Sequence, residues 1–180
     1  VFTRLYDPNQ FGTFGIVFAA VNFFMPFIGL KLDVAIIQEN TIKGRSHLFR
    51  AIVTFNLFIS LLASFIVIKY LNGSVNLSNI YFFPLIFFFL YSFGFYQAHN
   101  QLLVSEQKYK DFSNVLMLEK GSITVLKILF GLLYGNWIFL FISEIGAKLS
   151  AIIYQRKLLS YRALIFDRKI INRFDWSRYK

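Results

Sequence analysis

Charged residues stand inside otherwise apolar stretches in the second half of the sequence. They are Glu119, Lys127, Glu144 and Lys148, with Lys120 beside the first of them. A charge in apolar surroundings is stable only with a partner, so these groups could pair with one another, hold an anionic substrate or pass a coupling cation. Lys127 lies eight residues before the turn residue Gly135, and Glu144 lies nine residues after it. At about 1.5 Å of helix rise per residue, both side chains are expected at nearly the same depth.

The other two charges extend the same pattern. Glu119 lies 16 residues before Gly135 and Lys148 lies 13 after it, an axial mismatch of about 4–5 Å that long side chains can close. Glu144 and Lys148 are also i, i+4 partners in the favourable order. The sequence therefore predicts a paired acidic–basic set between two adjacent helices. Two interpretations stay open: a structural ion-pair network that lets charged helices insert and pack, or an aqueous path that contacts a substrate or coupling ion.

The composition predicts an all-α integral membrane protein. Of its 180 residues, 57% are hydrophobic, 20% aromatic and only 16% charged, whereas a soluble domain is typically about 25% charged. The absence of cysteine excludes thiolate catalysis and cysteine-based zinc sites. With two histidines, no glycine-rich phosphate loop and no Gly-x-Ser-x-Gly elbow, we expect no enzyme, catalytic residue, metal site or cofactor.

Five stretches are long and apolar enough to be membrane spans, which need about 20 residues each. They cover residues 11–30, 51–71, 80–98, 115–134 and 137–155, and together they hold 99 residues but only six of the 28 charged side chains. Such segregation is expected of hydrocarbon, where a charge is costly. The chain is therefore expected to form an antiparallel bundle over residues 1–155, followed by a basic segment over 156–180.

The basic residues predict the orientation of this bundle. Thirteen Lys and Arg residues fall on one side, after the first, third and fifth spans, and two fall on the other. The positive-inside rule places the richer side and the C-terminus in the cytoplasm, and residue 1 outside. It also accounts for the net charge of +10 without nucleic acid as a partner. Residues 156–180 fit either an amphipathic helix on the inner leaflet or a linker to a next helix.

Several local features predict how the spans pack. Pro26 and Pro84 interrupt the first and third spans, and kinks are expected there. Gly131-x-x-x-Gly135 offers a small-residue stripe for close helix packing. Polar residues at the inner end of the third span, including His99 and Asn100, either line a vestibule or cross-link helices.

Three segments resemble a known family. They are Arg4-Leu-Tyr-Asp-Pro8 followed by Lys31-x-Asp33-x-Ala35-Ile36, then Tyr96-Gln97-Ala98-x-Asn100 with Lys108-Tyr109-Lys110, and finally Gly131-Leu-Leu-Tyr-Gly135. In order and spacing they resemble bacterial O-antigen and capsule flippases of the multidrug/oligosaccharidyl-lipid/polysaccharide superfamily. The resemblance implies helices two to six of a protein with 12–14 helices, so that a preceding helix and the second half lie outside this sequence.

The resemblance also implies a function. Such proteins flip polyprenyl-pyrophosphate-linked oligosaccharide across the bacterial inner membrane by alternating access, and a proton or sodium gradient is a common driving force. Arg4, Lys31 and Asp33 match family motif positions, and with the four intramembrane charges they are the substrate- or ion-pathway candidates. The paired Glu144 and Lys148 match no family signature. Two alternatives remain, a drug/cation antiporter of the same superfamily and a non-transporting scaffold of a glycan-assembly complex.

Overall fold

The structure is a computed structural model that describes residues 5–28, 32–71 and 82–159. Arg4 and Lys31 lie outside these residues, as does nearly all of the basic segment 156–180. The described residues form helices joined by short turns and contain no strand, so the prediction of an all-helical chain is confirmed for them. In chain order the elements are α2 (Pro8–Phe24), a 3₁₀ turn η1 (Met25–Phe27), α3 (Leu32–Gln38), α4 (Ile42–Leu71), α5 (Phe82–Ser105), α6 (Tyr109–Leu133) and α7 (Trp137–Leu158).

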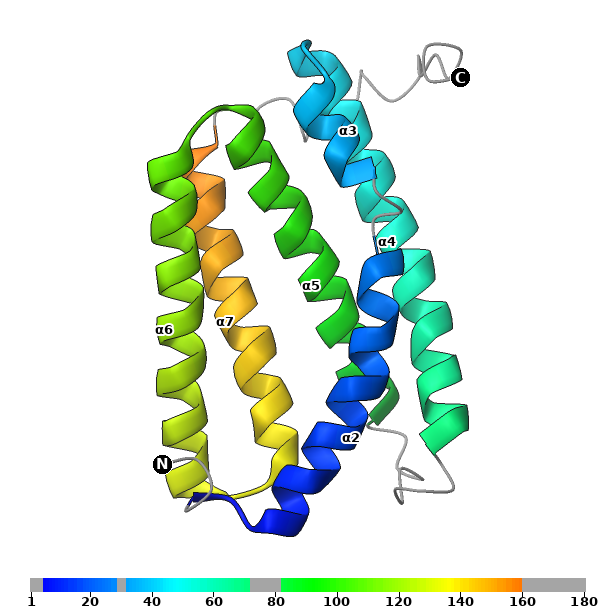
Figure 1. Ribbon diagram of the computed structural model, residues 1–180, viewed down its shortest axis with the longest axis vertical. Helices are drawn as coiled ribbons and strands as arrows, with labels where there is room; N and C mark the ends of the chain where they lie inside the picture. Colours follow the sequence, from blue (N-terminus) through cyan, green and yellow to red (C-terminus); the bar gives the residue numbers. More distant parts are fainter. Residues whose placement is uncertain (1–4, 29–31, 72–81, 160–180) are drawn as a thin grey trace.

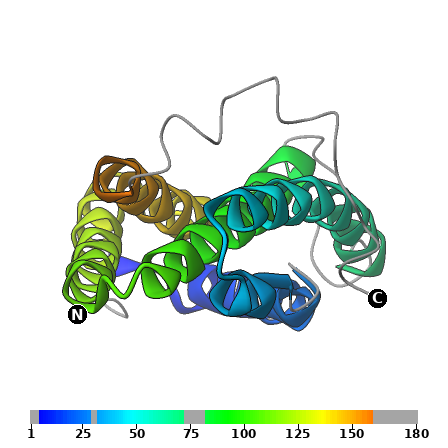
Figure 2. The same ribbon diagram turned by 90° about the horizontal axis from the view of Figure 1, so that it is seen from above.

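The long helices alternate in direction. In Figure 1, α2, α5 and α7 run upward while α4 and α6 run downward. Seen from above in Figure 2, α5 runs through the middle, with α6 and α7 on one side and α4 on the other. The pairs that pack most extensively are α6 with α7, α4 with α5, and α5 with α7. An antiparallel helical arrangement centred on α5 is therefore the architecture of the described residues.

Buried apolar side chains gather in two clusters, one in each half of this arrangement. One cluster joins α2, α4, α5 and α7 and centres on rings such as Phe89 and Phe141. The other joins α3, α4, α5, α6 and α7 around Ile36, Ile52 and Leu102. Because α5 contributes to both clusters, it is the element against which the other helices are positioned.

The two predicted proline positions lie at different places along the helices. α2 ends at Phe24 and a 3₁₀ turn containing Pro26 follows, which confirms the predicted interruption of the first span. Pro lacks the N–H that would continue the α-helical ladder. α5 as described begins at Phe82, so Pro84 lies in its first turn. The kink predicted at Pro84 stays a prediction, because residues 72–81, which precede α5, lie outside the described residues.

The hairpin between α6 and α7 turns through the predicted residues. Gly135 has φ +60°, a conformation that glycine adopts without a Cβ penalty. Asn136 caps α7, because its side-chain oxygen accepts a hydrogen bond from the backbone N–H of Ile138 at 3.0 Å. These two residues set the antiparallel register on which the depth argument for the charges depends.

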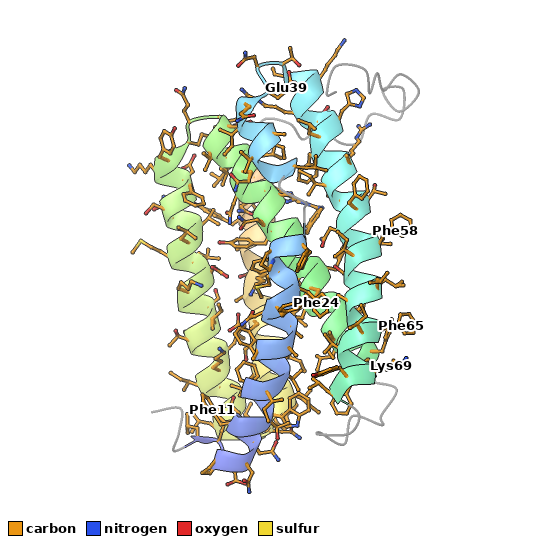
Figure 3. All side chains as sticks on the ribbon, turned by 45° about the vertical axis from the view of Figure 1, so that its right-hand side comes forward. Phe11, Phe24, Glu39, Phe58, Phe65 and Lys69 are labelled. Atoms are coloured by element: carbon orange, nitrogen blue, oxygen red, sulfur yellow. The ribbon has the colours of Figure 1, made fainter. Side chains whose placement is uncertain are left out.

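Three of the described helical stretches are long and apolar enough to cross a membrane: Pro8–Phe27, Ile42–Leu71 and Trp137–Leu158. α5 and α6 are also long, at 24 and 25 residues. α6, however, carries Glu119, Lys120 and Lys127, and α5 ends in polar residues. The surface agrees with an apolar environment, because Phe58 and Phe65 point outward from α4 with 65% and 61% of their surface exposed (Figure 3).

Candidate functional site: a buried charge cluster

The predicted ion pairs between α6 and α7 are present. The Lys127 ammonium donates to Glu144 Oε1 at 2.7 Å. Lys127 comes from α6 and Glu144 from α7, at the matching depth that the helix rise implies. Their side chains are 17% and 10% exposed respectively. The contact is therefore a charge-assisted hydrogen bond in a largely desolvated place, where such bonds are strong.

Lys148 connects this pair to Glu119. Its ammonium donates to Glu144 Oε2 at 3.0 Å and lies 3.9 Å from Glu119 Oε1. Counted as whole residues, Glu119 and Lys148 are each 4% exposed and Glu144 is 8% exposed. We call Lys127, Glu144, Lys148 and Glu119 the charge cluster. Its two carboxylates and two ammonium groups cancel in net charge.

Aromatic side chains surround the charge cluster. The Tyr96 hydroxyl of α5 donates to Glu119 Oε2 at 3.3 Å. The Lys148 ammonium lies 5.2 Å from the centre of the Phe89 ring, also on α5, and the Lys127 ammonium lies 5.5 Å from that of Phe14 on α2. Both distances fall within the range of cation–π attraction. Two further helices, α5 and α2, therefore surround the charges that α6 and α7 carry.

Lys120 is the fifth charge of this region, but its environment differs. Its ammonium lies 3.4 Å from Glu119 Oε2, yet its side chain is 73% exposed. Its removal leaves the contacts that Lys127 and Lys148 make with Glu144 and Glu119 in place. Lys120 therefore serves as a natural control for the buried lysines.

Tyr96 is the part of this site that sequence reasoning did not assign to it. In the sequence, Tyr96 is notable only as a neighbour of the polar residues late in α5. For those polar residues, two interpretations were open: they line a vestibule, or they cross-link helices. The structure shows a cross-link one turn further on, where Gln155 Nε2 of α7 donates to Asn100 Oδ1 at 2.6 Å. His99 is 1% exposed and its Nδ1 lies 2.9 Å from the Phe95 carbonyl oxygen. His99 and Asn100 are therefore both buried.

A contact near the N-terminus holds the α6 turn that carries Lys127. The Tyr6 hydroxyl donates to the Lys127 carbonyl oxygen at 2.8 Å, and Tyr6 is 2% exposed. A Cβ at Gly131 would lie 2.9 Å from Tyr6 Cε2. The small residue predicted to allow close helix packing therefore accommodates the Tyr6 ring instead. Gly146, further along α7, does face the neighbouring helix, since a Cβ there would lie 3.3 Å from Leu126 Cδ1.

The remaining candidates from the sequence are not brought to the charge cluster by any described contact. The backbone of Asp33 belongs to α3; Arg4 and Lys31 are outside the described part of the chain. Within the described ranges, no group of three or more histidine, aspartate and glutamate residues could hold a metal ion. In the charge cluster, lysine ammonium groups already lie at the carboxylate oxygens.

Comparison with known proteins identifies no relative. No family model matches the chain, no curated protein is similar to it, and no solved structure resembles it.

Proposed function

We propose that this chain is part of a bacterial inner-membrane transporter that flips lipid-linked oligosaccharide or polysaccharide repeat units by alternating access. The sequence resemblance described above supports the identity of the cargo. The basic excess among the intramembrane charges, three lysines against two glutamates, favours an anionic cargo over the cation of a drug antiporter.

The proposal includes five membrane crossings, by α2 with η1, α4, α5, α6 and α7. The alternating directions of these helices (Figure 1) place the described basic residues outside the charge cluster mainly at one end. Lys43, Arg45, Lys110 and Arg156 lie near that end, and Lys69 lies near the other. Under the positive-inside rule the first end is cytoplasmic. The length of α5 and α6 and the neutralisation of the α6 charges by α7 support counting these two helices as spans.

One observation carries the transport proposal: four charges lie buried in the middle parts of two adjacent helices. Apolar side chains would have been sufficient there if packing were the only requirement. A charge at the centre of an isolated span costs about 2.5–3.5 kcal/mol on insertion scales. Ionisable residues kept in such places commonly belong to substrate or ion paths. Lys127 and Glu144 are the more exposed members, so they are the members from which such a path would start.

The test is complementation of a strain that lacks export of the repeat unit, using the full-length gene. Glu144→Gln is expected to reduce export strongly while the protein still inserts, because Lys127 and Lys148 lose their shared partner. Lys120→Gln, which removes an exposed charge beside the same cluster, is the matched control and should export normally. Normal export by Glu144→Gln would contradict a transport role for the cluster.

A second function, a non-transporting scaffold, is favoured by the exact cancellation of charge within the cluster. A closed set of ion pairs satisfies itself and needs no substrate. The double variant Lys127→Gln/Glu144→Gln separates the two functions, since it keeps the cluster neutral through Lys148 and Glu119. A scaffold should recover its function in this double variant, whereas a transporter that uses Lys127 and Glu144 should not.

A further inference from the structure

The Lys148 ammonium occupies a place built by three helices. It lies 3.0 Å from Glu144 Oε2 on α7, 3.9 Å from Glu119 Oε1 on α6, and 5.2 Å from the ring centre of Phe89 on α5. Lys148 itself is 4% exposed. Two carboxylates and an aromatic face directed at one point are the groups that a small cation prefers.

Apart from Lys148, the two buried carboxylates have only one largely buried ammonium group between them, that of Lys127. Glu119 and Glu144 are 4% and 8% exposed, and a buried carboxylate without a partner is strongly destabilising. Lys127 contacts the other oxygen of Glu144, and Lys120 lies beside the other oxygen of Glu119. Neither lysine contacts the two oxygens that face Lys148.

We propose that Glu119, Glu144 and Phe89 form a site for a small monovalent cation, and that the tethered ammonium of Lys148 is its permanent occupant. The site exists in the wild type as a filled site. Removal of the Lys148 head group should leave a vacancy of the same charge preference, which a free cation of similar size can enter.

This inference also specifies the ion dependence of the charge cluster, and in that respect it rests on the proposed transport function. Because the occupant is covalently attached, sodium finds no vacant carboxylate pair at this point in the wild type. Export by the wild-type protein should therefore show no sodium requirement that arises from this site.

The experiment uses the full-length protein in lipid nanodiscs, with Lys148→Ala as the principal variant. Its thermal unfolding midpoint is measured at equal ionic strength in methylammonium, sodium and choline chloride. We expect a large loss of midpoint in choline, whose three methyl groups prevent entry. Methylammonium, which matches the lysine head group, should restore part of the loss in a saturable manner, and sodium should do so more weakly.

Two variants serve as controls. Glu119→Gln/Lys148→Ala removes one charge of each sign, so Glu144 keeps Lys127 and no vacancy for a cation remains; its midpoint should be equal in all three salts. Lys120→Ala removes the exposed lysine beside Glu119 and should behave like the wild type in all three salts.

The proposal is overturned if Lys148→Ala has the same midpoint in all three salts, or if it fails to fold even in saturating methylammonium while the double variant folds. It is also overturned if the wild type shows the same methylammonium response, because the cation would then bind elsewhere. None of these results depends on transport. A lack of export by the wild-type gene would refute the proposed function alone and leave the cation site standing.

Discussion

The Tyr6 ring packs against Gly131 in space that a side chain would occupy: a Cβ at position 131 would lie 2.9 Å from Tyr6 Cε2. The Tyr6 hydroxyl donates to the Lys127 carbonyl one turn away, across 121 residues of sequence. In the same region Gln10 Oε1 accepts a hydrogen bond from the first backbone N–H of α7, that of Trp137, at 3.2 Å. Tyr6, just before α2, and Gln10, in its first turn, therefore fasten the turn end of the α6–α7 hairpin.

Gly131→Ala should destabilise the protein, because the added methyl group forces Tyr6 and the neighbouring Leu5 to move. Gly121→Ala, on the same helix with nothing within 4 Å of the added carbon, is the matched control. It should be neutral or stabilising by up to about 1 kcal/mol, since alanine is the better helix former. Thermal unfolding of both variants measures the difference. Equal unfolding midpoints for the two variants would show that the packing of Tyr6 does not require a glycine at position 131.

Tyr6→Phe isolates the hydrogen bond from the ring packing. Loss of the hydroxyl should cost about 1 kcal/mol, the usual net value of a hydrogen bond, and the ring should stay in place against Gly131. Denaturant or thermal unfolding gives the free-energy change. The double variant Tyr6→Phe/Gly131→Ala then tests whether the two contacts are coupled, as expected for neighbours that share one side chain.

A double-mutant cycle on Lys127 and Glu144 should show strong coupling. Each single Gln variant leaves a buried charge without its 2.7 Å partner, and breaking a buried pair from one side costs about 3–5 kcal/mol. The double variant should be markedly more stable than the sum of the two single losses predicts. Lys120→Gln, with its exposed side chain, should change stability by no more than about 0.5 kcal/mol. Additive losses around the cycle would mean that the pair does not form in the membrane.

Cysteine accessibility tests the membrane orientation on a background that contains no native cysteine. Lys43 and Lys69 lie near opposite ends of α4, a helix of 30 residues and therefore about 45 Å long, which exceeds the roughly 30 Å of a bilayer's hydrocarbon core. Lys43→Cys should react with an impermeant maleimide only after cell lysis, and Lys69→Cys in intact cells. Reaction of both in the same compartment would refute the orientation.

Phe58→Cys distinguishes a lipid-facing surface from a water-facing one. Phe58 is 65% exposed (Figure 3), so a soluble protein would present this cysteine to water and react rapidly. In a membrane the same position faces hydrocarbon and should resist the impermeant reagent even after lysis, while a detergent-denatured sample reacts. Rapid labelling in native membranes would contradict the assignment of α4 as a span.

Gly94→Ala should weaken the packing of α4 on α5. The added carbon would lie 2.3 Å from Ile28 Cγ2 and 2.4 Å from Asn56 Oδ1, so both side chains would have to shift. Asn56 is fully buried and its Nδ2 donates to the Tyr91 carbonyl oxygen at 2.9 Å, while the Ser60 hydroxyl donates to Asn56 Oδ1 at 3.0 Å. Gly12→Ala, with open space around the added carbon, is the control. A smaller unfolding loss for Gly94→Ala than for Gly12→Ala would argue against this contact.

The sequence by itself determined the all-helical character of the described residues, the turn at Gly135 and the depth at which the charges meet. These properties follow from local rules: the apolar length of a helix, the conformational freedom of one glycine, and a fixed rise per residue. Counting residues from the turn was sufficient to predict that Lys127 meets Glu144. The same local rules place a kink at Pro84, and this stays a prediction.

Only the tertiary structure decided which helix each polar face meets. Nothing in the spacing indicated that Tyr96 would bind Glu119, that Asn100 would pair with Gln155, or that Gly131 would accommodate Tyr6 rather than a helix. Depth along a helix is one coordinate and can be counted, whereas the neighbour that a side chain meets depends on how each helix is rotated and packed. That rotation is set by the joint burial of many side chains around α5, a property of the assembled chain rather than of any one segment.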